Sequence, residues 1–314
     1  MKSITYTFIC QDGQLECEAM VLAASMRRHL TFPAKLVAIV PLPSRIFGTP
    51  SPISLKILRD LDVEVVKARN AYMSPPRVRR QRYTGKEKAP FFTNKWVCLE
   101  QPKDCDMVVF LDSDQICWQP ITYGKWFDSR IVLRRVGRSA GKFLRNSWKQ
   151  IFKHAGVALP ADRVMHDDDF LGPELVNGGL VGIDLPLRQQ FIRTWSQLWK
   201  QVKRGPLANK YFCEQTALSL TMHVMTQAGE SVAVLARSRK AQSEYYHYGR
   251  WCNLLKHPDK QAQKALAGNL QGYQRQARRA RTMLFAVLDE HPRIFEFLRG
   301  RHANEYTRKF FRDV

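Results

Sequence analysis

Apolar runs separated by helical segments open this chain, and they constrain its fold more than any other feature. Residues 4–10 alternate as a strand does, residues 35–40 (KLVAIV) are continuously apolar, and residues 63–66 form a third short run. Between them, residues 14–30 and 53–61 carry the 3.6-residue periodicity of amphipathic helices. Because strands without polar alternation must be buried on both faces, this order predicts a parallel sheet covered by helices on each side.

The same α/β pattern continues through the middle of the chain and then stops. The further segments expected are strands at 107–111 and 175–184, and helices at 94–100, 139–155, 187–202 and 211–228. Beyond residue 255 the strand signals disappear, and the chain has the pattern of basic helices interrupted at His291-Pro292. We therefore predict an α/β domain over residues 1–255 and a basic helical extension over residues 256–314.

The charge balance points to anionic partners. The chain holds 50 basic and 28 acidic residues among 314, a formal net charge of +22. Such an excess attracts phosphorylated substrates, anionic membrane surfaces or nucleic acid through long-range electrostatics, although a solvated basic surface that keeps the protein soluble explains it as well. A core of ordinary size is expected beneath that surface, since 45% of the residues are hydrophobic.

The cysteines and the N-terminus bear on the compartment. Seven cysteines occur without a Cys-x-x-Cys pair, which favours free, buried thiols in a reducing cytoplasm over a disulfide framework or a zinc site. The first ten residues are too short and polar a run for a signal peptide, and no stretch of 18 apolar residues follows. We expect a cytoplasmic protein, with peripheral attachment to the inner face of the membrane as a further option.

Two carboxylates follow the most apolar strand. The run Val108-Val109-Phe110-Leu111 leads directly into Asp112-Ser113-Asp114. In open α/β sheets, ligands bind outside the carboxyl ends of the strands, and paired hard oxygen ligands there suit Mg²⁺ or Mn²⁺ bridging a diphosphate. The same residue types also make ordinary turns at strand ends, so the motif alone leaves both interpretations open.

Four more polar groups follow a fixed order along the chain, and each has a structural explanation as well as a functional one. Lys95 suits a solvated helix start, a glycine pair suits a β-bulge, an acidic residue offsets a helix macrodipole, and a histidine between tyrosines suits packing. The groups are Lys95, Asn177-Gly178-Gly179, Glu214-Gln215 and His247-Tyr248-Gly249-Arg250.

Together with Asp112-Ser113-Asp114, these groups make residues 4–255 resemble the glycogenin-like glycosyltransferases of the GT-A fold. The resemblance implies a Rossmann-like α/β fold with a mixed, mostly parallel sheet and helices on both faces, to which the C-terminal helical extension expected from the composition is added. It also implies a nucleotide-sugar donor, a UDP-sugar by family habit, and a Mn²⁺ or Mg²⁺ ion. The chain departs from the family pattern in having Glu at 214 for Asp and a histidine–glycine spacing one residue tighter.

The resemblance assigns roles residue by residue. It places the metal at Asp112, Asp114 and His247, and the residues near the transferring sugar at Asn177, Glu214 and Gln215. Donor-binding residues would be Lys95, Asp112, Gly178, Gly179, Gly249 and Arg250. The implied reaction retains anomeric configuration and passes the sugar to an acceptor that is anionic or membrane-associated, which the basic stretches at 67–103 and 125–153 would suit.

Two other classes of function remain as alternatives. Haloacid-dehalogenase-type phosphatases also end an apolar strand in Asp-x-Asp, and residues 166–169 could serve as their later acidic pair. Their motif, however, normally lies near the N-terminus and carries Thr or Val where this chain has Ile116. A basic nucleic-acid-binding protein would explain the charge and the basic–aromatic residues 141–153, but no recognised binding motif occurs.

The C-terminal extension has two interpretations of its own. Its basic cluster adjoins an apolar triplet, a pattern that suits docking on an anionic membrane. Packing of the same helices against the sheet is the alternative. The residues concerned are Arg275, Arg278, Arg279, Arg281, Met283, Leu284 and Phe285.

Overall fold

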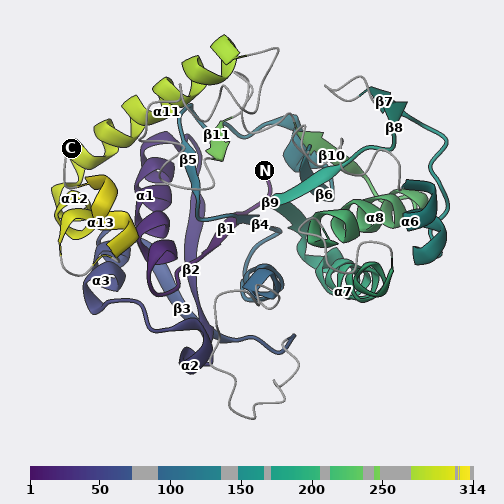
Figure 1. Ribbon diagram of the computed structural model, residues 1–314, viewed down its shortest axis with the longest axis horizontal. Coiled ribbons are helices and arrows are strands. Elements are labelled where there is room, and N and C mark those ends of the chain that lie inside the picture. The colour runs from purple at the N-terminus through teal and green to yellow at the C-terminus, as the bar shows by residue number, and fades with distance from the viewer. Residues whose placement is uncertain are drawn as a thin grey trace.

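A seven-stranded mixed sheet runs through the described part of the molecule (Figure 1). The computed structural model describes residues 1–72, 91–135, 148–165, 171–205, 213–235, 244–247, 270–300, 303 and 305–311. The strand order is β10-β6-β9-β4-β1-β2-β3. The strands are β1 (Ile4–Ile9), β2 (Ala34–Leu42), β3 (Val63–Arg69), β4 (Met107–Leu111), β6 (Ile131–Arg135), β9 (Val176–Asp184) and β10 (Val232–Leu235).

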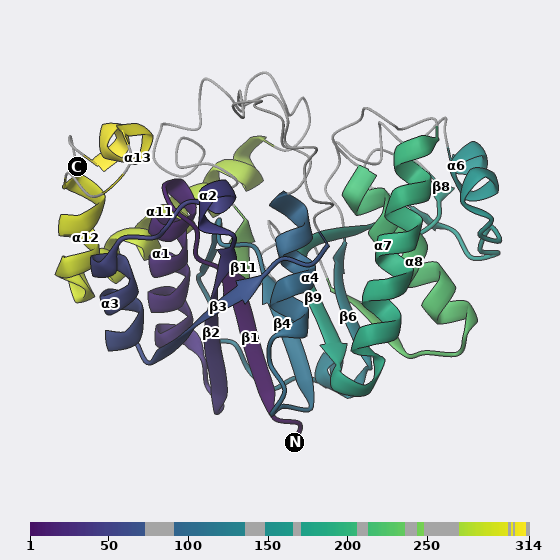
Figure 2. The ribbon, with the colours of Figure 1, turned by 90° about the horizontal axis from the view of Figure 1, so that it is seen from below.

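Four of the six strand pairings in this sheet are parallel, which confirms the predicted mixed, mostly parallel sheet. β1 pairs in parallel with β2 and β4, β2 with β3, and β6 with β10. β9 alone runs antiparallel to both of its neighbours, β4 and β6. The parallel strands therefore end at one edge of the sheet, opposite the edge at which the N-terminus and the start of β1 lie (Figure 2).

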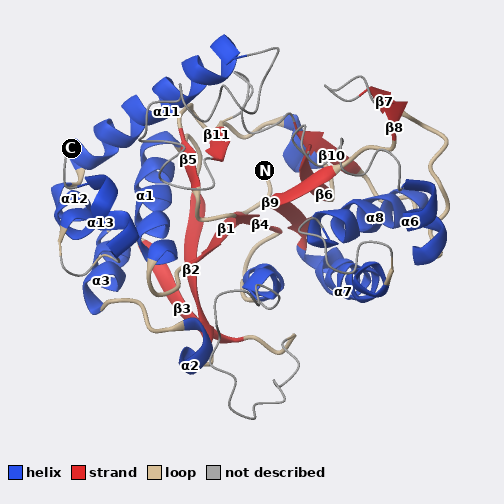
Figure 3. Cartoon of the chain, viewed as in Figure 1, coloured by secondary structure: helices blue, strands red, loops and turns tan. Residues whose placement is uncertain are grey.

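Helices cover both faces of the sheet, as Figure 3 shows. One face carries α1 (Gln14–His29), α3 (Pro52–Asp60), α11 (Leu270–Glu290), α12 (Pro292–Arg299) and α13 (Glu305–Phe311). The other carries α4 (Asn94–Glu100), α6 (Trp148–Ala155), α7 (Arg188–Arg204) and α8 (Cys213–Gln227). Each face of the sheet packs against its helices in a separate hydrophobic core. Because successive side chains of a strand point to opposite faces, Val109 of β4 lies in the first core, with α1, and Val108 lies in the second, with α4. This arrangement confirms the predicted α/β architecture with helices on both faces, and it is consistent with a Rossmann-like GT-A fold.

Short elements complete the described chain. α2 (Ser44–Phe47) follows β2, and η1 (Phe91–Thr93), η2 (Lys125–Asp128) and η3 (Leu185–Leu187) are single 3₁₀ turns. β5 (Gln115–Cys117) pairs antiparallel with β11 (Tyr245–His247), and β7 (Val164–Met165) with β8 (Leu171–Gly172). The sequence patterns did not predict β6, β10 or these short strands. Of the helix expected at 139–155, the described part is α6.

The C-terminal helices are part of the first core. α11 ends at Glu290 and α12 begins at Pro292, where proline was expected to break the helix. Leu284, Val287 and Phe297 are almost completely buried in the cluster that α1 also joins. Residues 251–269 lie outside the described part, so the division at residue 255 stays a prediction.

Two further expectations concern the cysteines and membranes. The six cysteines of the described residues are all buried and free, as the sequence predicted for small apolar side chains. Among the described helices, none combines the length and the apolar character that crossing a bilayer demands.

Candidate functional site

The carboxylate turn that follows β4 is tied to the strands on either side of it. The Asp112 backbone N–H donates to the Gly179 carbonyl of β9 at 3.0 Å. On the other side, the Ser113 hydroxyl donates to the Ile9 carbonyl at the end of β1, at 2.6 Å. The turn therefore lies where the parallel strands end, which is the edge that open α/β sheets use for ligands.

Lys95 brings three of the predicted site segments together. Its Nζ lies 3.0 Å from Asp112 Oδ1, 3.7 Å from Glu214 Oε1 and 3.1 Å from the Gly178 carbonyl, to which it donates. Its side chain is only 12% exposed, and those of its two acidic partners are 21% and 15% exposed. In this site, Lys95 is an interior cation and not the solvated helix-start lysine of the alternative interpretation.

Electrostatics within this cluster follow from burial and proximity. Burial opposes the charged form of Lys95, but Asp112 and Glu214 outweigh it and raise the pKa of Lys95 above its usual value. Burial raises the pKa of Glu214, and Lys95 limits that rise. The Lys95 ammonium thus offsets the repulsion between the Asp112 and Glu214 carboxylates.

Gly178 gives the Glu214 carboxylate its space. A Cβ at position 178 would lie 2.2 Å from Glu214 Oε1 and 3.1 Å from Lys95 Nζ. The glycine pair also belongs to a bulge in β9, since the register with β6 passes from Leu133–Val181 to Arg134–Asn177. The bulge and the close approach are the same feature, so the structural and functional interpretations of the glycines do not exclude each other.

Asp114 has an acidic neighbour that the sequence interpretation did not include. Glu18 of α1 is 1% exposed and accepts a hydrogen bond from the Gln14 amide. Burial, then the charges of Asp114 and Asp112, raise the pKa of Glu18 well above its usual range. The signal available in the sequence was an acidic residue in the otherwise apolar stretch of residues 17–24, directly after the first strand.

Asn177 and Gln215 occupy different environments. The Asn177 side-chain oxygen accepts from the Gly179 N–H at 2.6 Å and so shapes the bulge. Gln215 follows Glu214 on α8, and its Oε1 is buried without a hydrogen-bond partner among the described residues. A catalytic role for either side chain remains a prediction.

His247 lies on the strand beside the carboxylate turn. It is the last residue of β11, and its backbone is opposite Gln115, the residue after Asp114. Its side chain, together with Gly249 and Arg250, lies outside the described residues. Among the side chains that are described, no three from His, Cys, Asp and Glu form a group able to hold a metal ion.

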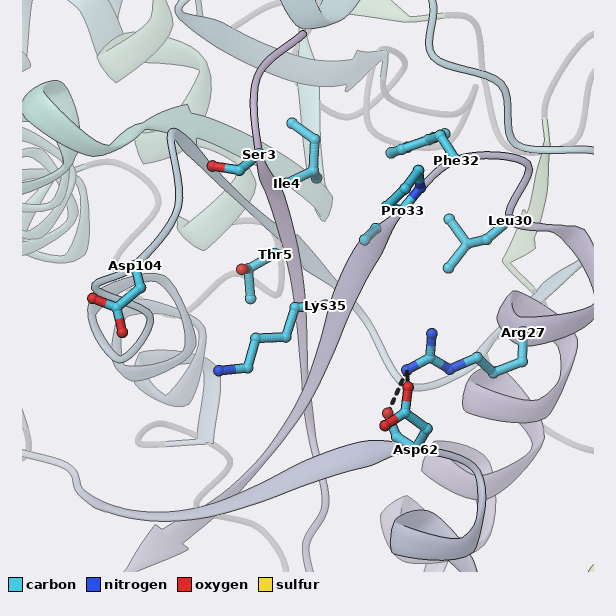
Figure 4. Close-up of a pocket in the computed structure, with 11 residues that line it drawn as sticks. Ser3, Ile4, Thr5, Arg27, Leu30, Phe32, Pro33, Lys35, Asp62 and Asp104 are labelled. Carbon is cyan, nitrogen blue, oxygen red and sulfur yellow. Dashed lines mark hydrogen bonds and ion pairs between the residues drawn. The ribbon is translucent and has the colours of Figure 1, made fainter.

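A separate cavity of about 510 Å³ lies at the opposite edge of the sheet (Figure 4). The amino ends of β1 and β2 form its floor, and the ion pair of Arg27 with Asp62, 2.9 Å long, lies at its rim. Lys35, which also lines the cavity, pairs with Glu64 at 2.5 Å. Because its cations are already paired and it is remote from the carboxyl ends of the strands, this cavity is not part of the candidate site.

Comparison with known families identifies the class of protein that this geometry belongs to. Residues 6–226 match the family described as the Rhodobacterales glycosyltransferase domain. The matched range runs from β1 to the last turn of α8 and so includes Lys95, Asp112, Asp114, Gly178 and Glu214. No curated protein matches the chain.

Proposed function

The chain belongs to the Rhodobacterales glycosyltransferase family, and we propose that it uses a nucleotide-diphosphate sugar, a UDP-sugar, at the Asp112–Asp114 edge of the sheet. It is a glycosyltransferase enzyme, which sets aside the phosphatase alternative and the alternative of a non-enzymatic nucleic-acid-binding protein. The proposal places it among the glycogenin-like members of the GT-A fold, with a divalent ion and retention of configuration.

The observation that carries this proposal is the convergence of Lys95, Asp112, Gly178 and Glu214. Four segments that are far apart in the sequence meet at the carboxyl edge of the sheet, with the Lys95 ammonium within 3.7 Å of the other three. A cation and carboxylates held in a partly enclosed site are what recognition of a sugar and a charged diphosphate requires. The backbone at Gly178 provides a surface that a ligand can approach closely.

The donor set around the turn suits a hard divalent cation. Asp112 pairs with Lys95, and Asp114 lies close enough to Glu18 to raise the pKa of Glu18. Three carboxylates therefore lie at this edge of the sheet, and carboxylate oxygens are the ligands that hard divalent cations prefer. We propose that Asp114, Asp112 and His247 hold Mn²⁺ or Mg²⁺. When bound, such an ion neutralises the charge that develops on the departing diphosphate.

The remaining groups would act by binding and orientation. Lys95 would hold Asp112 and Glu214 in place, and Glu214 would accept hydrogen bonds from sugar hydroxyls. The acceptor that we propose is anionic or membrane-associated, because a net charge of +22 exceeds what one diphosphate needs. The resemblance to glycogenin-like enzymes is the support for retention, and the anomeric configuration of the product, read by NMR, tests it.

A thermal-shift panel of nucleotide sugars with and without Mn²⁺ tests the proposal. We expect one donor to raise the melting temperature only when the metal is present, since a ligand that binds the folded state stabilises it. Asp114→Asn should abolish this shift, whereas the control Asp104→Asn, at the opposite edge of the sheet, should retain it. A wild-type protein that responds to no nucleotide sugar would refute the proposed donor class.

A further inference from the structure

A fully buried guanidinium lies behind the carboxylate turn. Arg134 of β6 is 3% exposed, and its Nη1 donates to Gln115 Oε1 at 3.0 Å. Its guanidinium carbon lies 5.1 Å from the centre of the Tyr245 ring. Within the described part of the chain, its Nε and Nη2 have no hydrogen-bond partner and it forms no ion pair. Since an unpaired buried charge is costly, packing alone does not account for this residue.

Arg134 connects to the site through one side chain. Gln115 receives the Arg134 hydrogen bond on its oxygen and donates from its Nε2 to the Gly179 carbonyl. The same carbonyl accepts the backbone N–H of Asp112 at 3.0 Å. A continuous chain of hydrogen bonds therefore runs from Arg134 to the backbone N–H of Asp112, the first residue of the turn.

Arg134 and the Gly179 carbonyl together determine which way the Gln115 amide faces. A guanidinium only donates hydrogen bonds and a carbonyl only accepts them. With Arg134 on one side and the Gly179 carbonyl on the other, the amide can satisfy both in one orientation only. A neutral apolar residue at position 134 would leave the buried Gln115 Oε1 without its donor, so the amide would be held from the Gly179 side alone.

Gly179, whose carbonyl accepts from Gln115, lies where β9 stops pairing regularly with β6. Leu133 pairs with Val181 but Arg134 pairs with Asn177, so residues 178–180 have no register partner on β6. A bulged backbone needs other partners for its polar groups. Gln115 supplies one at Gly179, next to the glycine that faces Lys95 and Glu214.

We propose that Arg134 and Gln115 are positioning residues for glycosyl transfer, which fix the Gly178–Gly179 bulge against Asp112. The inference rests on the proposed nucleotide-sugar site. Neither side chain needs to touch the donor, because both act through the Gly179 carbonyl and the turn that it anchors.

The first test is Arg134→Met. Arg134→Met removes the desolvation cost of a buried charge but leaves the buried Gln115 Oε1 without its donor, so the melting temperature of the free protein should change little. Affinity for the stabilising nucleotide sugar with Mn²⁺, measured by titration calorimetry, should nevertheless fall about 10-fold to 100-fold, as when a residue supporting a metal ligand is lost. A residue with a purely structural role would lose stability and affinity together. Arg134→Lys, which keeps a cationic donor, should recover part of the affinity.

The matched control is Arg130→Met, the same substitution on the chain just before β6. Arg130 pairs with Glu230 and with Asp184, and Asp184 lies beside the amino end of β4, away from the candidate site. Arg130→Met should therefore leave donor affinity unchanged. Gln115→Glu is the second variant, for the case in which Arg134→Met does not fold. It gives Arg134 a carboxylate partner but removes the donor to the Gly179 carbonyl, so it should fold and lose affinity as Arg134→Met does.

Hydrogen exchange separates this inference from the proposed function, because it needs no ligand. The amides of Asp112 and Gly179 should exchange about tenfold faster in Arg134→Met and Gln115→Glu than in Arg130→Met, since local opening governs exchange. Unchanged exchange at both amides, or wild-type donor affinity in a folded variant, would overturn the positioning role. Faster exchange in a protein whose wild type binds no nucleotide sugar would refute the donor class and leave the positioning of the bulge supported.

Discussion

Lys95 shows how one residue determines the electrostatics of the site. Its ammonium pairs with Asp112 at 3.0 Å and with Glu214 at 3.7 Å, and the three side chains are largely shielded from water. Truncating the cation would leave two carboxylates close together without a counter-charge. Such a loss is far more costly in the interior than at an exposed pair.

We expect Lys95→Met to lower the free energy of unfolding by about 3 kcal/mol at pH 8, a typical cost of breaking a buried ion pair. The deficit should shrink towards pH 5. Burial raises the pKa of Glu214, and losing Lys95 raises it further. A carboxyl whose pKa is higher in the folded state stabilises that state at low pH and loses this contribution as the pH rises through its folded pKa.

Urea unfolding of the wild type and Lys95→Met between pH 5 and pH 8 checks this expectation. Lys56→Met removes an exposed lysine that pairs with Asp60 at 2.9 Å and serves as the control, with little change at any pH. A deficit in Lys95→Met that is the same at both ends of the pH range would contradict the role assigned to Glu214.

At the scale of elements, the site depends on how β9 meets α8. The strand passes close to the start of the helix because Gly178 has no side chain, and the Glu214 carboxylate fills the space that a Cβ would take. The Val176 N–H donates to Ser219 Oγ and so joins the same two elements, while the Ser219 hydroxyl donates to the Gln215 carbonyl within α8. A methyl group at position 178 would therefore have to displace the Glu214 carboxylate.

Gly178→Ala should cost about 1–3 kcal/mol of stability by overpacking, and should also displace Glu214 and weaken donor binding at least about tenfold. Adding Glu214→Asp shortens the acidic side chain by one methylene and should recover stability. Gly182→Ala in the same strand is the control: its Cβ would meet Val132 at 3.1 Å in the core, so stability should fall while donor affinity holds. Calorimetric titration and thermal unfolding of the wild type and the three variants provide the comparison, and normal donor affinity in Gly178→Ala would be the contrary result.

For the molecule as a whole, the C-terminal helices complete the layer that covers one face of the sheet. Leu284 is buried in the core, and Met283 and Phe285 pack partly against it. Arg278 and Arg279 are exposed, and Arg279 lies over the Trp118 ring at 5.7 Å. Of the two interpretations of this segment, the described residues support packing against the α/β core. Contact with an anionic surface would have to be made by the exposed arginines.

Leu284→Ala should therefore destabilise the whole protein, by about 2–5 kcal/mol, as truncation of a buried leucine does. Denaturant unfolding should remain a single transition that moves to lower denaturant concentration, whether followed by tryptophan fluorescence or by circular dichroism. Thr282→Ala, at an exposed position of α11, should have little effect. A second, separate transition in Leu284→Ala would mean that the C-terminal helices unfold on their own.

The sequence by itself determined the elements whose signals are local. Residues 94–100 and 107–111 were predicted with the bounds that α4 and β4 have, because apolar periodicity and the following Asp112 turn depend on neighbours along the chain. The order of the motifs likewise identified Lys95, Asp112, Gly178 and Glu214 as candidate partners before any distance was known.

Only the tertiary structure decided what those residues do to one another. β5, β6, β10 and β11 were not predicted, because their pairing comes from partners elsewhere in the chain. Gln115 and Arg134 have no pattern around them that distinguishes a buried polar group from a solvated one. Burial and hydrogen bonding across a sheet are non-local properties, so the support of the carboxylate turn became visible only once β4, β5, β6 and β9 were placed side by side.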